Sequence, residues 1–125
     1  MPNSDSVEAR LAVMRFDYAR RLPDAVARIR EAWRHVSLGK SPCGLSTIER
    51  EAHKLSGSGT AFGFPEVTIS ARYLESFVAT VSPRSPLTAE QSTQISALID
   101  RLEHATKTTP VAGSRNQSKA RVARQ

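Results

Sequence analysis

A histidine followed by small residues is the part of this sequence best suited to chemistry. The stretch from His53 to Gly63 reads HKLSGSGTAFG and contains three glycines. A glycine inside a helix costs about 1 kcal/mol relative to alanine. Glycines this close together therefore indicate either a loop or a site that something must approach closely. A neutral imidazole near physiological pH is a competent nucleophile toward a phosphoryl group, so the histidine has a chemical use in such a site.

The flanking residues favour a helix through the histidine rather than a loop. Apolar positions recur at helical spacing at Ile48, Ala52, Leu55, Gly59 and Phe62. Because successive helical residues are about 100° apart, this pattern turns His53 outward. Its expected neighbours on that flank are Glu49, Arg50, Ser56, Gly57 and Thr60. Gly57 is four residues further on and is a direct neighbour on the helix surface, so the pattern exposes both the imidazole and the backbone beside it.

Other interpretations of this stretch are weaker or less specific. Gly57, Gly59 and Gly63 superficially resemble a dinucleotide-binding pattern, but that pattern needs a preceding strand and the residues before His53 are helical. No Gly-Lys-Ser/Thr ending follows, which argues against a P-loop. The other histidines lie on other predicted helices without metal-ligand spacing, so we expect no metal site. A purely structural interpretation stays open, in which the glycines permit tight helix packing.

The rest of the chain predicts helices joined by short connections. We expect a short lead-in helix at residues 7–11 and a long helix from Phe16 to Val36, kinked at Pro23. A capping-box spacing at 46–49 predicts the start of the next helix, and Gly63 its C-terminal cap. Pro65 begins a third helix, and a second capping box at 88–91 opens a fourth.

These elements predict an all-α fold, an antiparallel four-helix bundle spanning residues 7–106. No segment alternates with the period of two that strands need. After residue 106 the helical periodicity ends, and residues 107–125 form a predicted disordered basic tail. The chain therefore contains one bundle domain and one tail.

The net charge of +6 comes mainly from this tail and not from the predicted bundle. The chain has 18 basic and 12 acidic residues, and five of the basic residues lie in 107–125, which holds no acid. Cys43 is the only cysteine, so no internal disulfide can form, and we expect this thiol to have no role. No apolar run is long enough to span a bilayer, and the N-terminus lacks the pattern of a secretory signal. We therefore expect a cytoplasmic protein.

The central stretch resembles a known signature. The pattern HxLxGSxxxxG from His53 to Gly63 is similar to that of histidine-containing phosphotransfer (HPt) domains. The run GTAFGF from Gly59 to Phe64 is similar in particular to the phosphotransfer domains of chemotaxis-type histidine kinases. The resemblance covers roughly residues 16–105, including the helix order. It implies a four-helix bundle whose exposed histidine carries a phosphoryl group as a phosphoramidate.

The resemblance also implies roles for individual residues. His53 matches the phosphoacceptor, and Gly57 matches the glycine that permits close approach. Glu75 on the following helix matches a glutamate that hydrogen-bonds the imidazole and orients it. The family usually has a lysine three residues after the histidine, whereas this chain has Ser56 there and Lys54 directly after the histidine. We therefore expect weaker electrostatic support for the phosphorylated histidine, with Lys54, Ser56, Gly57 and Thr60 as candidate contacts for a partner.

By this resemblance the chain is expected to be a phosphorelay carrier that exchanges a phosphoryl group with the aspartate of a response-regulator receiver domain. Its expected partners are a receiver domain, a sensor histidine kinase, or both, and it would have no cofactor and no kinase activity of its own. We expect a monomer that binds no membrane. An alternative is a non-phosphorylated adaptor that uses the same bundle face to regulate a receiver or kinase. Nucleic-acid contact through the basic tail is a third and weaker hypothesis.

Overall fold

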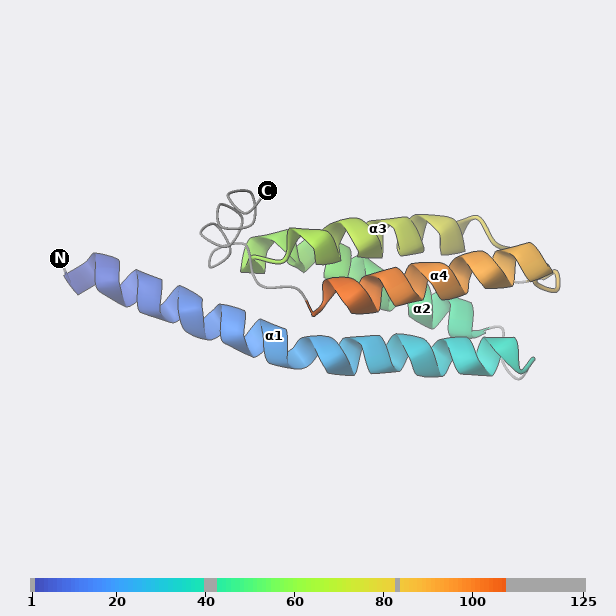
Figure 1. Cartoon of the computed structure of the whole chain (residues 1–125), viewed down its shortest axis with the longest axis horizontal. Coiled ribbons are helices and arrows are strands. Elements are labelled where there is room, and N and C mark those ends of the chain that lie inside the picture. Colours follow the sequence, from blue (N-terminus) through green and yellow to red (C-terminus); the bar gives the residue numbers. More distant parts are fainter. Residues whose placement is uncertain (1, 40–42, 83, 108–125) are drawn as a thin grey trace, which may run out of the picture.

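The computed structural model describes residues 2–39, 43–82 and 84–107, with side chains described from Ser6 onward. Its elements are α1 (Pro2–Ser37), α2 (Cys43–Ser58), the 3-10 helix η1 (Thr60–Phe62), α3 (Pro65–Ala79) and α4 (Ala89–Ala105), as Figure 1 shows. The described residues contain no strand. The predicted disordered tail lies outside the described residues, apart from Lys107.

The four long helices form a closed bundle around one apolar core. Helix α1 packs against α2 and α4, and α3 packs against the same two helices from the other side (Figure 1). The residues with no exposed surface come from all four helices: Ile29, Ile48, Ala52, Val67, Ala71, Leu74, Ile95, Ile99 and Leu102. This arrangement confirms the all-α four-helix bundle that the apolar spacing predicts.

Helix α1 is longer and more continuous than its sequence predicts. Residues 7–11, expected as a separate lead-in helix, are part of the single helix Pro2–Ser37. Pro23 lies inside this helix, and Figure 1 shows α1 changing direction along its length, as expected around an internal proline. Phe16, placed on the predicted apolar stripe, is 64% exposed, and from Ser6 onward Tyr18 is the first buried side chain of α1.

The start of α2 corrects the prediction of a capping box at 46–49. The helix begins at Cys43, and both Gly44 and Leu45 in its first turn are buried. A Cβ atom built on Gly44 would lie 2.6 Å from the carbonyl oxygen of Ala32. The glycine therefore lets the first turn of α2 lie directly against α1. This contact between two helices determines where α2 begins, and a local capping pattern does not contain that information.

A tight turn follows the C-terminal end of α2. After Ser58 it forms the single turn η1, and Gly63 follows with φ 90°, a left-handed conformation that suits glycine. The predicted cap at Gly63 is therefore present, although it closes η1 and not α2. The Phe62 ring stacks on Tyr18 of α1 with 4.7 Å between the ring centroids. Burial raises the pKa of the Tyr18 hydroxyl, which hydrogen-bonds Ser58 Oγ at 2.8 Å.

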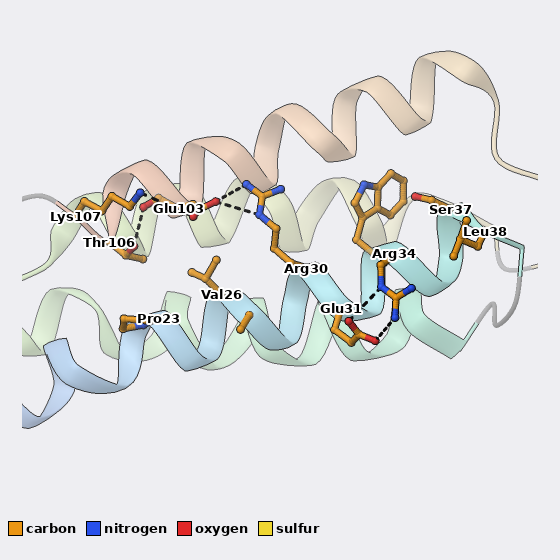
Figure 2. Close-up of a pocket in the computed structure, with 12 residues that line it drawn as sticks. Pro23, Val26, Arg30, Glu31, Arg34, Ser37, Leu38, Glu103, Thr106 and Lys107 are labelled. Atoms are coloured by element: carbon orange, nitrogen blue, oxygen red, sulfur yellow. Dashed lines mark hydrogen bonds and ion pairs between the residues drawn. The ribbon is translucent and has the colours of Figure 1, made fainter.

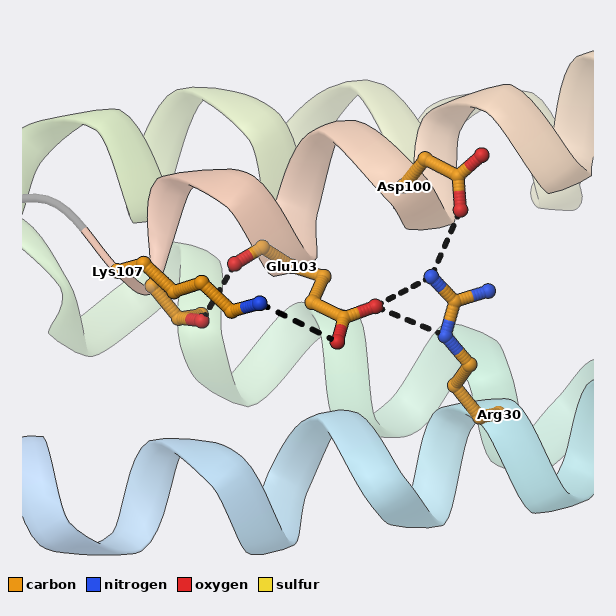
Figure 3. A network of polar contacts seen from close by, with 5 residues as sticks. Arg30, Asp100, Glu103 and Lys107 are labelled. Carbon is orange, nitrogen blue, oxygen red and sulfur yellow. Dashed lines mark hydrogen bonds and ion pairs between the residues drawn. The ribbon is translucent and has the colours of Figure 1, made fainter.

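Polar contacts join α1 to α4 along one side of the bundle (Figure 3). Arg30 of α1 donates hydrogen bonds to two carboxylates of α4. Its Nη2 donates to Asp100 Oδ1 at 2.7 Å, and its Nε donates to Glu103 Oε1 at 3.0 Å. Lys107 Nζ lies 3.9 Å from the other oxygen of Glu103. The hydrogen bond from Arg30 lowers the pKa of the Glu103 carboxyl, so this carboxylate stabilises the fold at neutral pH. The predicted capping box that opens α4 is confirmed, with Thr88 and Gln91 bonding reciprocally.

A groove lies beside these contacts, between the outer faces of α1 and α4 (Figure 2). Its lining includes the apolar side chains of Pro23, Val26 and Trp33, with Glu103 and Lys107 along the α4 side. No residue of α2 or α3 lines it. The groove is therefore separate from the face that carries His53.

Candidate functional site

His53 presents its ring to solvent from the middle of α2. The side chain is 73% exposed, and Nδ1 lies 2.7 Å from Glu75 Oε2 on α3. An ionised carboxylate can only accept a hydrogen bond, so a neutral His53 must carry its proton on Nδ1. This tautomer leaves the lone pair on Nε2, the other ring nitrogen. The arrangement thus combines an exposed nucleophilic nitrogen with a carboxylate that fixes the ring.

Ser56 contacts the same carboxylate from the next turn of α2. Its Oγ lies 3.3 Å from Glu75 Oε1 and 2.9 Å from the backbone oxygen of His53. A serine hydroxyl has one proton, so it can donate to only one of these oxygens at a time. Both contacts of the Ser56 hydroxyl are with Glu75 and the backbone of α2. Ser56 therefore supports the position of Glu75 and supplies no charge beside the ring.

A shallow hollow of about 360 Å³ lies beside the histidine. Its lining consists of Ser46, Glu49, Arg50, His53 and Glu75. Helical side chains lean toward the N-terminus of their helix, which brings the ring of His53 over the turn that contains Glu49 and Arg50. The Arg50 side chain is exposed and has no hydrogen bond or ion pair with any described residue. It is the only cation lining this hollow.

Arg50 and Ser46 were not among the candidate site residues from the sequence. The sequence places Arg50, three residues before His53, among the expected neighbours of the histidine but assigns it no role. The resemblance places the family's usual cation three residues after the histidine, whereas Arg50 lies three residues before it. Ser46 lies seven residues before His53, about two helical turns, so the same face of α2 carries both residues and both line the hollow.

Lys54 and Thr60 lie outside this group. Lys54 Nζ is 3.5 Å from Glu51, a carboxylate that also binds Arg28 of α1 at 3.2 Å. Lys54 is thus directed toward the α1 side of α2, whereas His53 contacts α3. Thr60 is exposed on η1, and its backbone N–H donates to Thr68 Oγ1 at 2.7 Å. Among the candidates, the structure brings together His53, Glu75 and Ser56.

The two central glycines have different surroundings. A Cβ atom built on Gly57 would meet no heavy atom within 4 Å. A Cβ atom on Gly59 would lie 2.6 Å from Thr68 Oγ1 and 2.8 Å from the carbonyl oxygen of Phe64. Tight internal packing therefore explains Gly59. It does not explain Gly57, whose exposed surface next to His53 is open to an approaching molecule.

The other two histidines lack this combination of features. His35 Nε2 lies 2.9 Å from Glu31 on the same helix, and Arg34 bonds that carboxylate as well. His104 is exposed on α4, and its side chain has no hydrogen bond or ion pair with any described residue. Only His53 bonds a carboxylate from a neighbouring helix and also borders a hollow with a free cation.

The described residues hold no group of three or more His, Cys, Asp and Glu side chains arranged to bind a metal ion. Within the same part of the chain, no helix has the length and apolar character required to cross a membrane.

The fold and this site together define a four-helix bundle with an exposed, carboxylate-bonded histidine. The family model of the Hpt domain matches residues 13–105, and the chain therefore belongs to the Hpt domain family. Membership assigns it to two-component signalling, in which Hpt domains act as phosphorelay carriers and interact with receiver domains and kinases. Comparisons with curated proteins and with solved structures gave no significant match.

Proposed function

We propose that this protein accepts a phosphoryl group on Nε2 of His53 and exchanges it with the aspartate of a response-regulator receiver domain. The Nε2 lone pair attacks the phosphorus atom of the receiver's acyl phosphate. An N–P bond forms, the O–P bond breaks, and the aspartate leaves as a free carboxylate. The return transfer reverses these events. The observation that carries the proposal is the exposed His53 ring with its Nδ1 bonded to Glu75.

Glu75 has a positioning role in this proposal. By accepting the Nδ1 proton in a hydrogen bond, it holds the tautomer in which Nε2 is free. When Nε2 gains the phosphoryl group, the ring becomes cationic while Nδ1 keeps its proton. The carboxylate then faces a positive imidazolium, and this pairing favours formation of the phosphohistidine.

Arg50 is the proposed source of positive charge for the phosphoryl oxygens. Ser56 occupies the position of the family's usual lysine, and its hydroxyl is directed at Glu75 and the His53 backbone. Arg50 lines the hollow beside the ring and is free of intramolecular partners among the described residues. A guanidinium can donate two parallel hydrogen bonds to phosphoryl oxygens.

Partner access depends on the small residues that follow the histidine. Gly57 leaves open surface where a side chain would otherwise project, and we propose that the rim of a receiver's active site contacts this surface. Lys54 and Thr60 flank it as further docking contacts. The receiver would supply its own metal ion and acidic pocket, so the carrier needs only an accessible nucleophile. The proposal places this exchange in the cytoplasm.

The test is transfer from a phosphorylated receiver or kinase to the wild-type chain and to His53→Gln. The wild type should acquire an acid-labile phosphoryl group, and the variant should acquire none. His35→Gln is the matched control, because His35 also bonds a carboxylate, and it should behave as the wild type does. Equal labelling of wild type and His53→Gln would show that another residue is the acceptor.

A second candidate is a non-phosphorylated adaptor that binds a receiver through the same face. Two features favour this candidate. The Ser56 hydroxyl contacts Glu75 and the His53 backbone, and the family's usual lysine is absent from this position. In that case His53→Ala would bind the receiver and signal as well as the wild type does.

A further inference from the structure

The N-terminal part of α1 projects beyond the bundle. We call residues 6–17 the α1 overhang. Every side chain in it is exposed except that of Arg15, which is partly buried, and burial begins at Tyr18. Figure 1 shows this part of α1 extending past the ends of the other three long helices. A helical stretch of this length is marginal in water without a packing partner.

The overhang gathers much of the exposed apolar surface of the described chain. The described residues include eight exposed large hydrophobic side chains. Five of them lie in the overhang, namely Val7, Leu11, Val13, Met14 and Phe16. Val7, Leu11 and Met14 follow a four-three spacing that continues to Tyr18, so they extend the face of α1 that enters the bundle core. This spacing is that of the apolar seam of a coiled coil. Val13 and Phe16 lie on other faces of the helix.

Charged residues border this seam in a self-complementary order. Glu8 and Arg15 lie along one edge, and Arg10 and Asp17 lie along the other. When two such helices run antiparallel with Leu11 opposite Met14, Glu8 faces Arg15 of the second copy and Arg10 faces its Asp17. A parallel pair would instead bring Arg10 against Arg15. None of these four side chains has an ion pair or hydrogen bond with a described residue of its own chain.

We propose that the α1 overhang pairs antiparallel with the overhang of a second copy of this chain. The seam is buried between the two helices, and the four interchain ion pairs fix the direction of pairing. The overhang contains no residue of α2 or α3, so both copies of His53 stay accessible in the dimer. The proposal replaces the sequence-based expectation of a monomer, and it does not depend on the phosphotransfer function.

Sedimentation of the full chain across a concentration series tests this pairing. The wild type should show a reversible monomer–dimer equilibrium, because so short a seam supports a weak dimer. Leu11→Ser removes an apolar side chain from both helices and should raise the dimer dissociation constant on the order of a hundredfold. Val13→Ser is the matched control, since Val13 is equally apolar and lies off the seam. It should leave dimerisation unchanged.

Charge reversals test the antiparallel direction. Glu8→Arg and Arg15→Glu should each weaken the dimer by about three- to tenfold, and the double variant should restore it. In a parallel dimer, Arg15→Glu would strengthen association by removing the contact with Arg10. The variants are on the surface, and an unchanged thermal midpoint of the diluted chain will show that the bundle is intact.

Three results would overturn the proposal. The first is a chain that stays monomeric at every concentration. The second is a dimer that Leu11→Ser leaves intact. The third is a monomer whose overhang variants lose affinity for a receiver domain, which would assign this face to that partner.

Discussion

Alanine at Gly57 and at Gly59 should have opposite effects on stability. Both residues have a right-handed helical backbone conformation, since Gly57 lies within α2 and Gly59, just before η1, has φ −54° and ψ −52°. At Gly57 the new methyl group would meet no atom within 4 Å. At Gly59 it would meet Thr68 and Phe64 at distances below 3.0 Å, and two of the three nearest atoms belong to the backbone. The two positions are therefore a matched pair within one motif.

The surroundings of each glycine determine how far alanine changes the free energy of unfolding. Alanine in place of glycine near the end of an exposed helix stabilises it by roughly 0.5–1 kcal/mol. For a bundle of this size that free energy raises the thermal midpoint by about 2–8 °C. Overpacking at Gly59 should destabilise the fold by about 1–3 kcal/mol, because Phe64 and Thr68 must move to accommodate the methyl group.

Circular dichroism of thermal and urea unfolding measures both changes, and phosphotransfer from a receiver measures function in the same samples. Gly57→Ala should be at least as stable as the wild type, and Gly57→Trp should fold but transfer slowly because its side chain blocks the receiver. A loss of stability in Gly57→Ala would refute the view that this glycine has no packing role. Normal transfer by Gly57→Trp would refute its role in partner access.

Three further predictions concern charged residues. Glu75→Gln should slow phosphotransfer by about tenfold or more, since an uncharged amide can either accept from or donate to Nδ1 and does not fix the tautomer, and rapid-quench kinetics will measure it. Arg50→Gln should shorten the lifetime of the phosphohistidine several-fold while Lys54→Ala does not, and equal lifetimes in both would exclude Arg50 as a phosphoryl contact. The low pKa of Glu103 adds stability that is present above its unfolded value, near 4.5, and is lost as the pH falls. Arg30→Met should therefore reduce the decline of unfolding free energy between about pH 5 and pH 3 in urea titrations.

The helix order could be predicted from sequence because apolar spacing reports directly which face of each helix is buried. The prediction holds for α3 and α4, where Val67, Leu74, Ile95 and Ile99 are all fully buried. It fails at the start of α2, because the position of Gly44 is determined by contact with Ala32, a residue distant in the chain. Such contacts between helices leave no periodic signal.

The site could be predicted only in part for a related reason. His53 was identifiable from its outward position and small neighbours, and its contact with Glu75 was expected from the family resemblance. The direction of the Ser56 hydroxyl and the hollow beside Arg50 depend on how α2 faces α3. Glycines also look alike in a sequence, so the open surface at Gly57 and the tight contact at Gly59 could be separated only by the atoms around them.

The most direct test of the central claim is to identify the phosphorylated atom. Mass spectrometry under alkaline conditions will locate the labelled residue after transfer from a receiver, and phosphorus–nitrogen NMR correlation will identify the ring nitrogen. We predict a phosphoryl group on Nε2 of His53, with Nδ1 still protonated and bonded to Glu75. A phosphoryl group on Nδ1 of His53, or on His35 or His104, would contradict it.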